Sequence, residues 1–249
     1  MEIKELIQEL KRKKELSDLD EGFVEHRVVD YLKQNKLEEQ FKDKKFIKTR
    51  RYDILFKDLR RLLREAYGMF RSDDFKEHPS TKSRIIYYKY IYKKIFEITG
   101  KPKKILDLGC GLNPLSYEYL GCNPFYYAAD ISNTELKIVN NYFKENKIKG
   151  ETFTFNMVDS SYKDLPKVDV CFLFKVLEEL ELIKRDISEK VIKEIKADWI
   201  IASFSKVTLG GKPIKKMWRV WFEKIIKKLG LYYVIFDVGD EIFFVIKKK

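Results

Sequence analysis

The fold of this chain is decided by residues 104–115, which read Lys104-Ile105-Leu106-Asp107-Leu108-Gly109-Cys110-Gly111-Leu112-Asn113-Pro114-Leu115. An apolar run that ends in Asp-x-Gly-x-Gly predicts a buried strand that stops in a glycine turn. Glycine suits that turn because a residue without Cβ lets the backbone bend sharply and approach a ligand closely. Asp130 follows a second apolar run, nineteen residues after Gly111, where an acid can accept hydrogen bonds from a ribose diol. Together these features indicate a site for a nucleoside cofactor.

The glycine turn also narrows the choice of cofactor. A dinucleotide fingerprint, Gly-x-Gly-x-x-Gly, needs a third glycine under the pyrophosphate, but Pro114 occupies that position. An acid two residues before the first glycine, here Asp107, is usual in class I S-adenosylmethionine (SAM) methyltransferases. SAM has no phosphate, so the turn need only bring backbone groups and a carboxylate to its methionine part. We therefore predict SAM as the cofactor; another nucleotide and a turn that binds no ligand are the alternatives.

The chain is strongly basic, and part of the excess charge is local. It has 249 residues, a hydrophobic fraction of 45% and a formal net charge of +12, which fits a globular protein of one large or two modest domains. Between Phe41 and Gly68, ten Lys or Arg residues stand against four acids. Cations that meet phosphates release condensed counterions, so this balance predicts a nucleic-acid partner. A thermophile surface is the alternative, but it would explain a high total charge rather than a local excess of one sign.

A basic amphipathic helix is expected inside this segment. Leu55, Leu59, Leu62 and Leu63 recur at helical spacing, and several arginines turn away from that stripe. A basic helix face is a reasonable RNA surface, with a merely solvated face as the alternative. The candidate RNA-binding residues are Arg50, Arg51, Arg60, Arg61 and Arg64. No DNA partner is expected.

The sequence lacks recognisable targeting signals, and its cysteines do not suggest disulfides, so we predict a cytoplasmic protein. No apolar run approaches the ~20 residues that span a bilayer, and the first residues lack the apolar core of a signal peptide, so no membrane partner is expected. The three cysteines, Cys110, Cys122 and Cys171, have no metal-binding spacing. We interpret them as free thiols, mostly buried, and predict no metal site.

The chain divides into a helical half and an alternating half. Residues 1–100 carry helical periodicity, ending in a long helix from Thr81 to about Ile98, and are predicted to form an RNA-binding domain. Residues 101–249 alternate strands and helices, which predicts a seven-stranded class I SAM-methyltransferase (Rossmann-like) sheet closed by an antiparallel C-terminal hairpin at Gly239-Asp240. The expected strands are 104–109, 125–131, 152–158, 168–174, 198–204, 231–237 and 241–247, and the expected helices between them include 133–146, 188–196 and 217–228.

The residues after the fourth expected strand limit the chemistry. Enzymes that methylate exocyclic base amines usually carry an Asn/Asp-Pro-Pro-aromatic element there, and this chain has Phe174-Lys175-Val176-Leu177 instead. Methylation at C5 of a pyrimidine needs a cysteine nucleophile, but the nearest one, Cys171, sits inside an apolar strand. N7 of guanine is nucleophilic without a general base, so positioning would supply most of the rate. The residues are consistent with methyl transfer to that atom.

Four segments resemble a known family in order and spacing: His78-Pro79-Ser80-Thr81-Lys82-Ser83-Arg84-Ile85, the stretch 107–115, Leu173-Phe174-Lys175-Val176-Leu177, and Gly239-Asp240-Glu241-Ile242-Phe243-Phe244-Val245-Ile246. The chain is similar to the aminoglycoside-resistance 16S ribosomal RNA methyltransferases that make 7-methylguanosine. This resemblance is strong from His78 onward. It implies an N-terminal helical domain that docks on rRNA of the small ribosomal subunit and a C-terminal SAM-binding domain.

The resemblance also implies roles for single residues. Arg84 would pair with the cofactor's carboxylate, where a guanidinium fork suits bidentate binding. Asp107 with Gly109 and Gly111 would line the methionine part, and Asp130 would hold the ribose. The adenine would be contacted by Asp159 and Ser160, and Lys175 would lie near the target base and hold substrate or cofactor. The alternatives are an ion pair for Arg84, a turn former at Asp159 and a solvated strand-end Lys175.

The chain departs from the family at two positions, and its N-terminal helices differ from the family's in detail, which leaves the RNA target open. The family commonly has arginine at the position of Lys82 and proline at the position of Glu178. The Lys/Ile/Glu-rich composition is typical of a thermophile, where a housekeeping homologue acting on rRNA or tRNA is expected. A tRNA guanine methyltransferase, a small-molecule SAM methyltransferase and a non-catalytic RNA-binding factor therefore stay open as alternatives.

Overall fold

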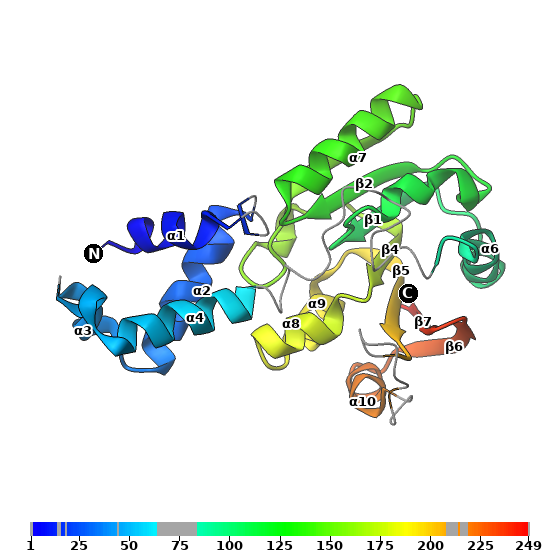
Figure 1. Cartoon of the computed structure of the whole chain (residues 1–249). Coiled ribbons are helices and arrows are strands. Elements are labelled where there is room, and N and C mark those ends of the chain that lie inside the picture. The colour runs from blue at the N-terminus through cyan, green and yellow to red at the C-terminus, as the bar shows by residue number, and fades with distance from the viewer. Residues whose placement is uncertain are drawn as a thin grey trace. The chain divides into compact units, whose positions relative to one another are not determined.

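The computed structural model describes residues 2–13, 16–17, 19–43, 45–63, 84–207, 214 and 219–248 (Figure 1). These residues form two compact units. The first, which we call the helical unit, holds residues 2–63 together with Ile131–Thr134, and the second, the sheet unit, holds the other described residues from Arg84 onward. Each unit has a core of its own and is described separately.

The helical unit follows the apolar periodicity of its sequence. Its helices are α1 (Ile3–Lys11), α2 (Glu21–Gln34), α3 (Glu38–Lys42), the 3₁₀ turn η2 (Phe46–Lys48) and α4 (Arg50–Leu63). The stripe predicted on α4 is buried at Leu55, Leu59 and Leu63. Tyrosine hydroxyls tie helices together at the edge of this core: Tyr52 Oη donates to Glu9 at 2.9 Å, and Tyr31 Oη donates to Asp58 at 2.8 Å.

The sheet unit contains the predicted seven-stranded sheet (Figure 1). Its strands are β1 (Lys104–Leu108), β2 (Phe125–Asp130), β3 (Gly150–Thr154), β4 (Val168–Phe174), β5 (Ala197–Ser205), β6 (Tyr232–Val238) and β7 (Glu241–Lys247). The spatial order is β3-β2-β1-β4-β5-β7-β6. The first five strands run parallel, while β7 pairs antiparallel with both β5 and β6. The predicted fold class and the hairpin at Gly239-Asp240 are confirmed.

Helices cover both faces of the sheet because strand side chains alternate between them. One core joins Ile105, Phe172 and Phe243 to the helices α6 (Tyr88–Thr99) and α7 (Asn133–Glu145). The opposite core joins the neighbouring positions, such as Leu106 and Phe244, to α8 (Leu177–Ile183), α9 (Ile187–Glu194) and α10 (Val220–Lys228). Two short 3₁₀ segments, η4 (Asn113–Leu120) and η5 (Tyr162–Asp164), lie in the connections. In open parallel sheets of this kind, ligands bind at the carboxyl ends of the strands.

Helix α6 belongs to the sheet unit, so the units divide before it rather than near residue 100. The sequence predicted a helix from Thr81, but residues 81–83 lie outside the described part, residues 84–87 form a turn and α6 begins at Tyr88. Its apolar face, which includes Ile91, Tyr92 and Ile95, packs in the core on the α7 side of the sheet. Amphipathicity predicts a helix but not which core the helix joins.

Other differences from the expected elements have local causes. Strand β3 ends at Thr154 because its partner β2 ends at Asp130, opposite that residue. Phe155, Met157 and Val158 are buried in the core on the α9 side as a loop, although their apolar character predicts strand. The short helices η4 and α8 were not expected, and for the helix predicted at 217–228 the first two residues are not described and α10 begins at Val220. None of the described helices combines the length and the apolar character needed to cross a membrane.

Candidate cofactor and target site

The glycine turn after β1 joins the ends of two neighbouring strands. Gly109 N donates to the Ala129 carbonyl at 2.9 Å, and Gly111 N donates to Asp130 Oδ2 at 2.9 Å. Gly109 has φ +67°, and a Cβ there would lie 2.9 Å from Val176 Cγ2. A Cβ there would collide with the Val176 side chain, and a residue with a side chain would be strained at this positive φ, so the turn requires glycine at this position. The structure thus brings together three of the predicted cofactor residues, Gly109, Gly111 and Asp130.

Asp107, another predicted cofactor residue, is buried beneath this turn. One of its two carboxylate oxygens accepts hydrogen bonds and the other does not. Its Oδ2 accepts hydrogen bonds from Asn113 Nδ2 at 2.8 Å and Tyr126 Oη at 2.7 Å. Its Oδ1 is also buried but has no hydrogen-bond partner among the described residues. Burial raises the pKa of Asp107 to about 6, although the hydrogen bonds from Asn113 and Tyr126 act to lower it. A buried carboxylate oxygen without a donor is destabilising, so this atom fits a ligand that carries N–H groups.

Asp159 and Ser160 lie in a turn after β3 that Asn156 holds together. Asn156 Nδ2 donates to Asp159 Oδ2 at 2.9 Å, and Asn156 N donates to Ser160 Oγ at 3.1 Å. Asp159 itself is exposed. The same loop reaches the glycine turn, because Met157 Cε lies 3.2 Å from where a Gly109 Cβ would be. The structure therefore places these two residues on a loop that borders the glycine turn.

Arg84 and Lys175 meet at a carboxylate that the sequence motifs do not single out. Glu241 Oε2, at the start of β7, lies 3.1 Å from Arg84 Nε and 3.1 Å from Lys175 Nζ. Its Oε1 accepts a hydrogen bond from Ser203 Oγ. Arg84 Nη1 also donates to Asn113 Oδ1 at 3.0 Å. Through Asn113, which binds Asp107 as well, this buried cluster is connected to the cofactor side of the site.

The charges in this cluster depend on Glu241. Burial acts against the charge of Arg84, but Glu241, with smaller contributions from Tyr88, Tyr92 and Asp107, raises the Arg84 pKa above its ordinary value. The pKa of Lys175 is lowered by burial, although Glu241 acts to raise it. The Arg84–Glu241 pair lacks hydrogen-bond geometry at Nε and Oε2, so the attraction is that of close charges. The cluster thus brings the basic side chains of Arg84 and Lys175 to a single carboxylate.

The backbone of Lys175 is strained at the end of β4. Its φ is +55°, a left-handed conformation that costs energy for a residue with a side chain. Its N–H donates to the Ser203 carbonyl at 3.1 Å, which ties it to β5. Strain of this kind persists where the surroundings impose it, and here it fixes the direction of the lysine at the strand end. The solvated lysine considered from the sequence does not fit, because the side chain is only 15% exposed.

Glu178, at the family's proline position, forms an ion pair of its own. Arg219 Nε lies 2.9 Å from Glu178 Oε1, and Arg219 Nη2 donates to Glu178 Oε2 at 3.1 Å and to the Ser205 carbonyl at 2.8 Å. This pair connects the start of α8 with the end of β5 and the start of α10. The neighbouring Glu179 is half-buried, and burial raises its pKa to about 8.

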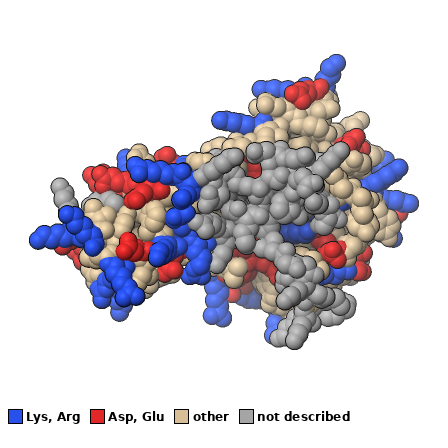
Figure 2. Space-filling model, viewed as in Figure 1, with Lys and Arg blue, Asp and Glu red and all other residues tan. Residues whose placement is uncertain are grey.

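Four of the five candidate RNA-binding arginines are described, and all four lie on α4; Arg64 is outside the described residues. Arg50, Arg51 and Arg61 are exposed, whereas Arg60 is half-buried with its guanidinium 5.7 Å from the centre of the Phe56 ring. Lys and Arg side chains gather in several groups on the helical unit, with acids between them (Figure 2). The structure thus supplies a basic, largely exposed helix, and Arg60 is its least accessible member.

Comparison with known proteins places the chain in a family. A model of the family described as "Ribosomal RNA methyltransferase (FmrO)" matches residues 68–231. The chain belongs to this family. The match includes the glycine turn, Asp130, Lys175 and most of the sheet, and it confirms the resemblance carried by the sequence motifs.

Relatives of the family agree in sequence and in fold. A 16S rRNA (guanine(1405)-N(7))-methyltransferase of Micromonospora echinospora is 26% identical over 175 residues, covering 69% of this chain and 63% of that protein. The enzyme of the same description from Serratia marcescens is 27% identical over 197 residues, 75% of each chain. The chain spans about 63% of the length of the first curated relatives it matches.

Solved structures share this fold over all or most of the chain. The 16S rRNA methyltransferase RmtF, in complex with S-adenosyl-L-homocysteine, superposes with a TM-score of 0.82 at 20% identity and covers 100% of both chains. The 16S rRNA methylase ArmA has a TM-score of 0.59 at 25% identity, covering 70% of this chain and 88% of ArmA. The fold described above is therefore the family's fold, including a helical region before the sheet.

Proposed function

We propose that this chain is a SAM-dependent RNA methyltransferase that transfers a methyl group to N7 of guanine in the 16S rRNA of the small ribosomal subunit. The observation that carries the proposal is the family match across the glycine turn and the sheet. The curated relatives are named for this reaction, and RmtF was solved with the demethylated cofactor. Such an enzyme would work in the cytoplasm, where ribosomes are.

The residues around the glycine turn fit SAM. Asp107 Oδ1 offers an unused buried acceptor to an ammonium group. Asp130 would hold the ribose, and Asp159 with Ser160 would contact the adenine from the bordering loop. When bound, SAM supplies an electrophilic methyl group on a sulfonium. Arg84, joined to Asp107 through Asn113, would direct its remaining N–H groups to the cofactor's carboxylate.

The target side of the site needs positioning rather than proton transfer. Guanine N7 has an in-plane lone pair, so no general base has to remove a proton before it attacks. Holding the reacting atoms in line can contribute on the order of 7–11 kcal/mol in well-oriented cases. Lys175 is the candidate positioning group, because its backbone is fixed at the strand end and its ammonium is held by Glu241. Arg50, Arg51, Arg60, Arg61 and Arg64 are proposed to bind the RNA.

The direct test of this proposal is methyl transfer from labelled SAM. The protein is incubated with small ribosomal subunits, with naked 16S rRNA and with tRNA, and each RNA is digested to nucleosides. Label in 7-methylguanosine from 16S rRNA is the expected result. Label only in tRNA would move the activity to the alternative substrate. Label in another nucleoside, or in none of the three RNAs, contradicts the proposal.

Two further measurements separate the remaining alternatives. A small-molecule methyltransferase would keep its activity when Arg50, Arg51, Arg60 and Arg61 are neutralised together. A non-catalytic RNA-binding factor would show no SAM binding by calorimetry, and its RNA affinity would not change in the variant Asp130→Ala. The proposed enzyme should bind SAM, lose that binding in Asp130→Ala and lose RNA methylation when the arginines are neutralised.

Neutralising the exposed arginines of α4 should reduce the salt dependence of RNA binding. Each cation that contacts a phosphate contributes about 0.7 to the slope of log K against log salt for single strands. In the triple variant Arg50→Gln, Arg51→Gln, Arg61→Gln we expect the slope to fall by about 2, measured by fluorescence anisotropy over a salt series.

The control for this measurement is the single variant Lys33→Gln, which removes an exposed charge on α2. Its slope should stay close to that of the parent protein. An unchanged slope in the triple variant would mean that α4 does not contact phosphates.

A further inference from the structure

The helical unit has a pocket where α3, η2 and α4 meet. It has a volume of about 270 Å³ and is lined by Gln40, Asp43, Lys45, Phe46, Thr49 and Arg51. That volume lies just below the ~300–1,000 Å³ typical of sites for drug-sized ligands. It is therefore suited to a smaller group, about the size of a single nucleobase. Arg51 is one of the arginines proposed above to bind RNA.

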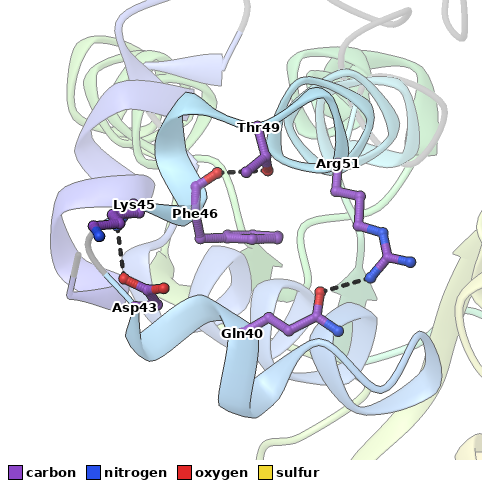
Figure 3. A pocket seen from close by; sticks show the side chains of 6 residues that line it. All are labelled: Gln40, Asp43, Lys45, Phe46, Thr49 and Arg51. Carbon is purple, nitrogen blue, oxygen red and sulfur yellow. Dashed lines mark hydrogen bonds between the residues drawn. The ribbon is translucent and has the colours of Figure 1, made fainter.

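The pocket presents donors and an acceptor around an aromatic ring (Figure 3). Asp43 and Arg51 lie on opposite sides of the Phe46 ring, with the Gln40 amide between them. Arg51 Nη1 donates to Gln40 Oε1 at 2.9 Å, which holds the guanidinium at the pocket. Asp43 Oδ1 accepts from the backbone N–H of Lys45 at 2.9 Å, which holds the carboxylate on the other side. The Lys45 ammonium points outward at the rim.

This combination does not suit a phosphate alone, because Asp43 would repel it. The edges of a nucleobase carry both hydrogen-bond donors and acceptors, so one base can bind a cation and a carboxylate at the same time. Guanine carries acceptors at O6 and N7, to which arginine can donate. It also carries N–H donors at N1 and N2, from which a carboxylate can accept hydrogen bonds. RNA-binding proteins commonly read unpaired bases by such edge contacts together with aromatic or guanidinium faces. The exposed Lys45, which lines the pocket, would meet a phosphate that flanks the base.

We propose that this pocket binds one unpaired guanosine of the RNA substrate, apart from the guanine that receives the methyl group. Arg51 binds the acceptor edge, Asp43 binds the donor edge, and Lys45 contacts a flanking phosphate. The inference rests on the proposed RNA-directed function and adds a place on the helical unit where sequence, not only charge, is recognised.

The variant Asp43→Asn distinguishes base recognition from electrostatic attraction, because the two predict opposite changes in RNA affinity. It removes one negative charge, so binding by electrostatics alone would become tighter. If Asp43 accepts from guanine, binding to RNA that contains the guanosine should instead weaken by about tenfold, because a good base-edge pair discriminates strongly in favour of the matching base. Asparagine keeps the oxygen that accepts from Lys45 N, so the loop is expected to retain its conformation.

The experiment uses the full chain and two labelled single-stranded oligonucleotides. One is oligouridine and the other carries a single central guanosine; their affinities are compared by fluorescence anisotropy. The parent protein should prefer the guanosine strand, Asp43→Asn should lose that preference, and the control Asp53→Asn, an exposed acid of α4 outside the pocket, should keep it. Equal affinities in the parent, or tighter binding of the guanosine strand by Asp43→Asn, would overturn the proposal.

A second measurement locates the bound base. An oligonucleotide with 6-thioguanosine at the central position is photo-crosslinked to the protein, and the modified peptide is identified by mass spectrometry. A crosslink in the peptide that contains Phe46 is expected, and a crosslink confined to the sheet unit would contradict the pocket. If methyl transfer to rRNA is absent while the guanosine preference and the crosslink remain, the proposed reaction fails and the pocket stands. Normal methylation with neither the preference nor the crosslink would overturn the pocket and leave the proposed reaction standing.

Discussion

Replacing Glu241 with alanine is expected to lower the free energy of unfolding by about 3–5 kcal/mol, the usual cost of breaking a buried ion pair from one side. The carboxylate lies 3.1 Å from Arg84 Nε and from Lys175 Nζ, and all three side chains are at most 15% exposed. Without it, two buried cations face one another, and the Ser203 hydroxyl loses its acceptor. Urea denaturation followed by circular dichroism measures the change. If the free energy of unfolding has the same slope against urea concentration in both proteins, the unfolding transition itself is unchanged.

A matched control is available in the same hairpin. Asp237 on β6 pairs with Lys206 at 2.8 Å, but the Asp237 side chain is 68% exposed. Its replacement by alanine removes the same kind of carboxylate from an exposed pair, and we expect a loss of about 0–1 kcal/mol. If Glu241→Ala were no more destabilising than Asp237→Ala, Glu241 would not be the group that compensates the two buried cations.

A second substitution tests the origin of the Glu241 effect. Lys175→Met removes one of the two cations, so Glu241→Ala should cost less in that background than in the parent chain. The coupling between the two positions, measured by a double-mutant cycle, isolates their interaction. An absence of coupling would mean that Glu241 does not stabilise Lys175, and the destabilisation would then come from its other contacts, those with Arg84 and Ser203.

The glycine turn and the sheet could be predicted because their signals are local. Asp107, Gly109 and Gly111 lie within five consecutive residues, and apolar runs between turns indicate the strands. The C-terminal hairpin follows from Gly239-Asp240 between two such runs. Each of these features depends on neighbours in the sequence, so no knowledge of the folded chain is needed.

The charge cluster could not be predicted, because its members come from three distant parts of the chain. Arg84 precedes α6, Lys175 follows β4 and Glu241 opens β7. Only the sheet order, which inserts β7 beside β5, brings Glu241 next to Ser203. A glutamate at the start of a hairpin strand gives no sign in the sequence that it will be buried. Arg60 illustrates the same limit, since its packing on Phe56 depends on side-chain conformation.

Replacing Asp107 with asparagine is expected to weaken binding of SAM and S-adenosylhomocysteine by about 10- to 100-fold, which corresponds to the ~1.5–3 kcal/mol of a hydrogen bond to a charged group. The proposed ligand contact is Oδ1, the buried oxygen that has no hydrogen-bond partner among the described residues. Asparagine can still accept from Asn113 and Tyr126 with its one oxygen, but it turns an N–H group toward the ligand. Isothermal titration calorimetry at pH 7.5 measures the loss. Unchanged affinity would place the ligand's ammonium group elsewhere.

The same substitution should not destabilise the ligand-free protein, and its effect should depend on pH. Burial raises the pKa of Asp107 to about 6, above its ordinary value of 3.8, so the folded state binds this proton more tightly than the unfolded state. The stability that Asp107 contributes is therefore fully present below about pH 4 and is lost as the pH rises through about 6, by roughly 3 kcal/mol at 1.36 kcal/mol per pKa unit. Asparagine does not ionise.

We accordingly expect the stability of Asp107→Asn relative to the parent protein to increase between pH 4.5 and pH 7.5, as measured by urea unfolding without ligand. Groups that titrate equally in both proteins cancel in that difference, which leaves the contribution of Asp107. The ligand affinity of the parent should fall below about pH 6, when the carboxylate takes up its proton, while the variant should bind weakly at every pH. A stability difference that stays constant across this range would mean that Asp107 keeps an ordinary pKa, and that its charge is balanced in the folded protein without any ligand.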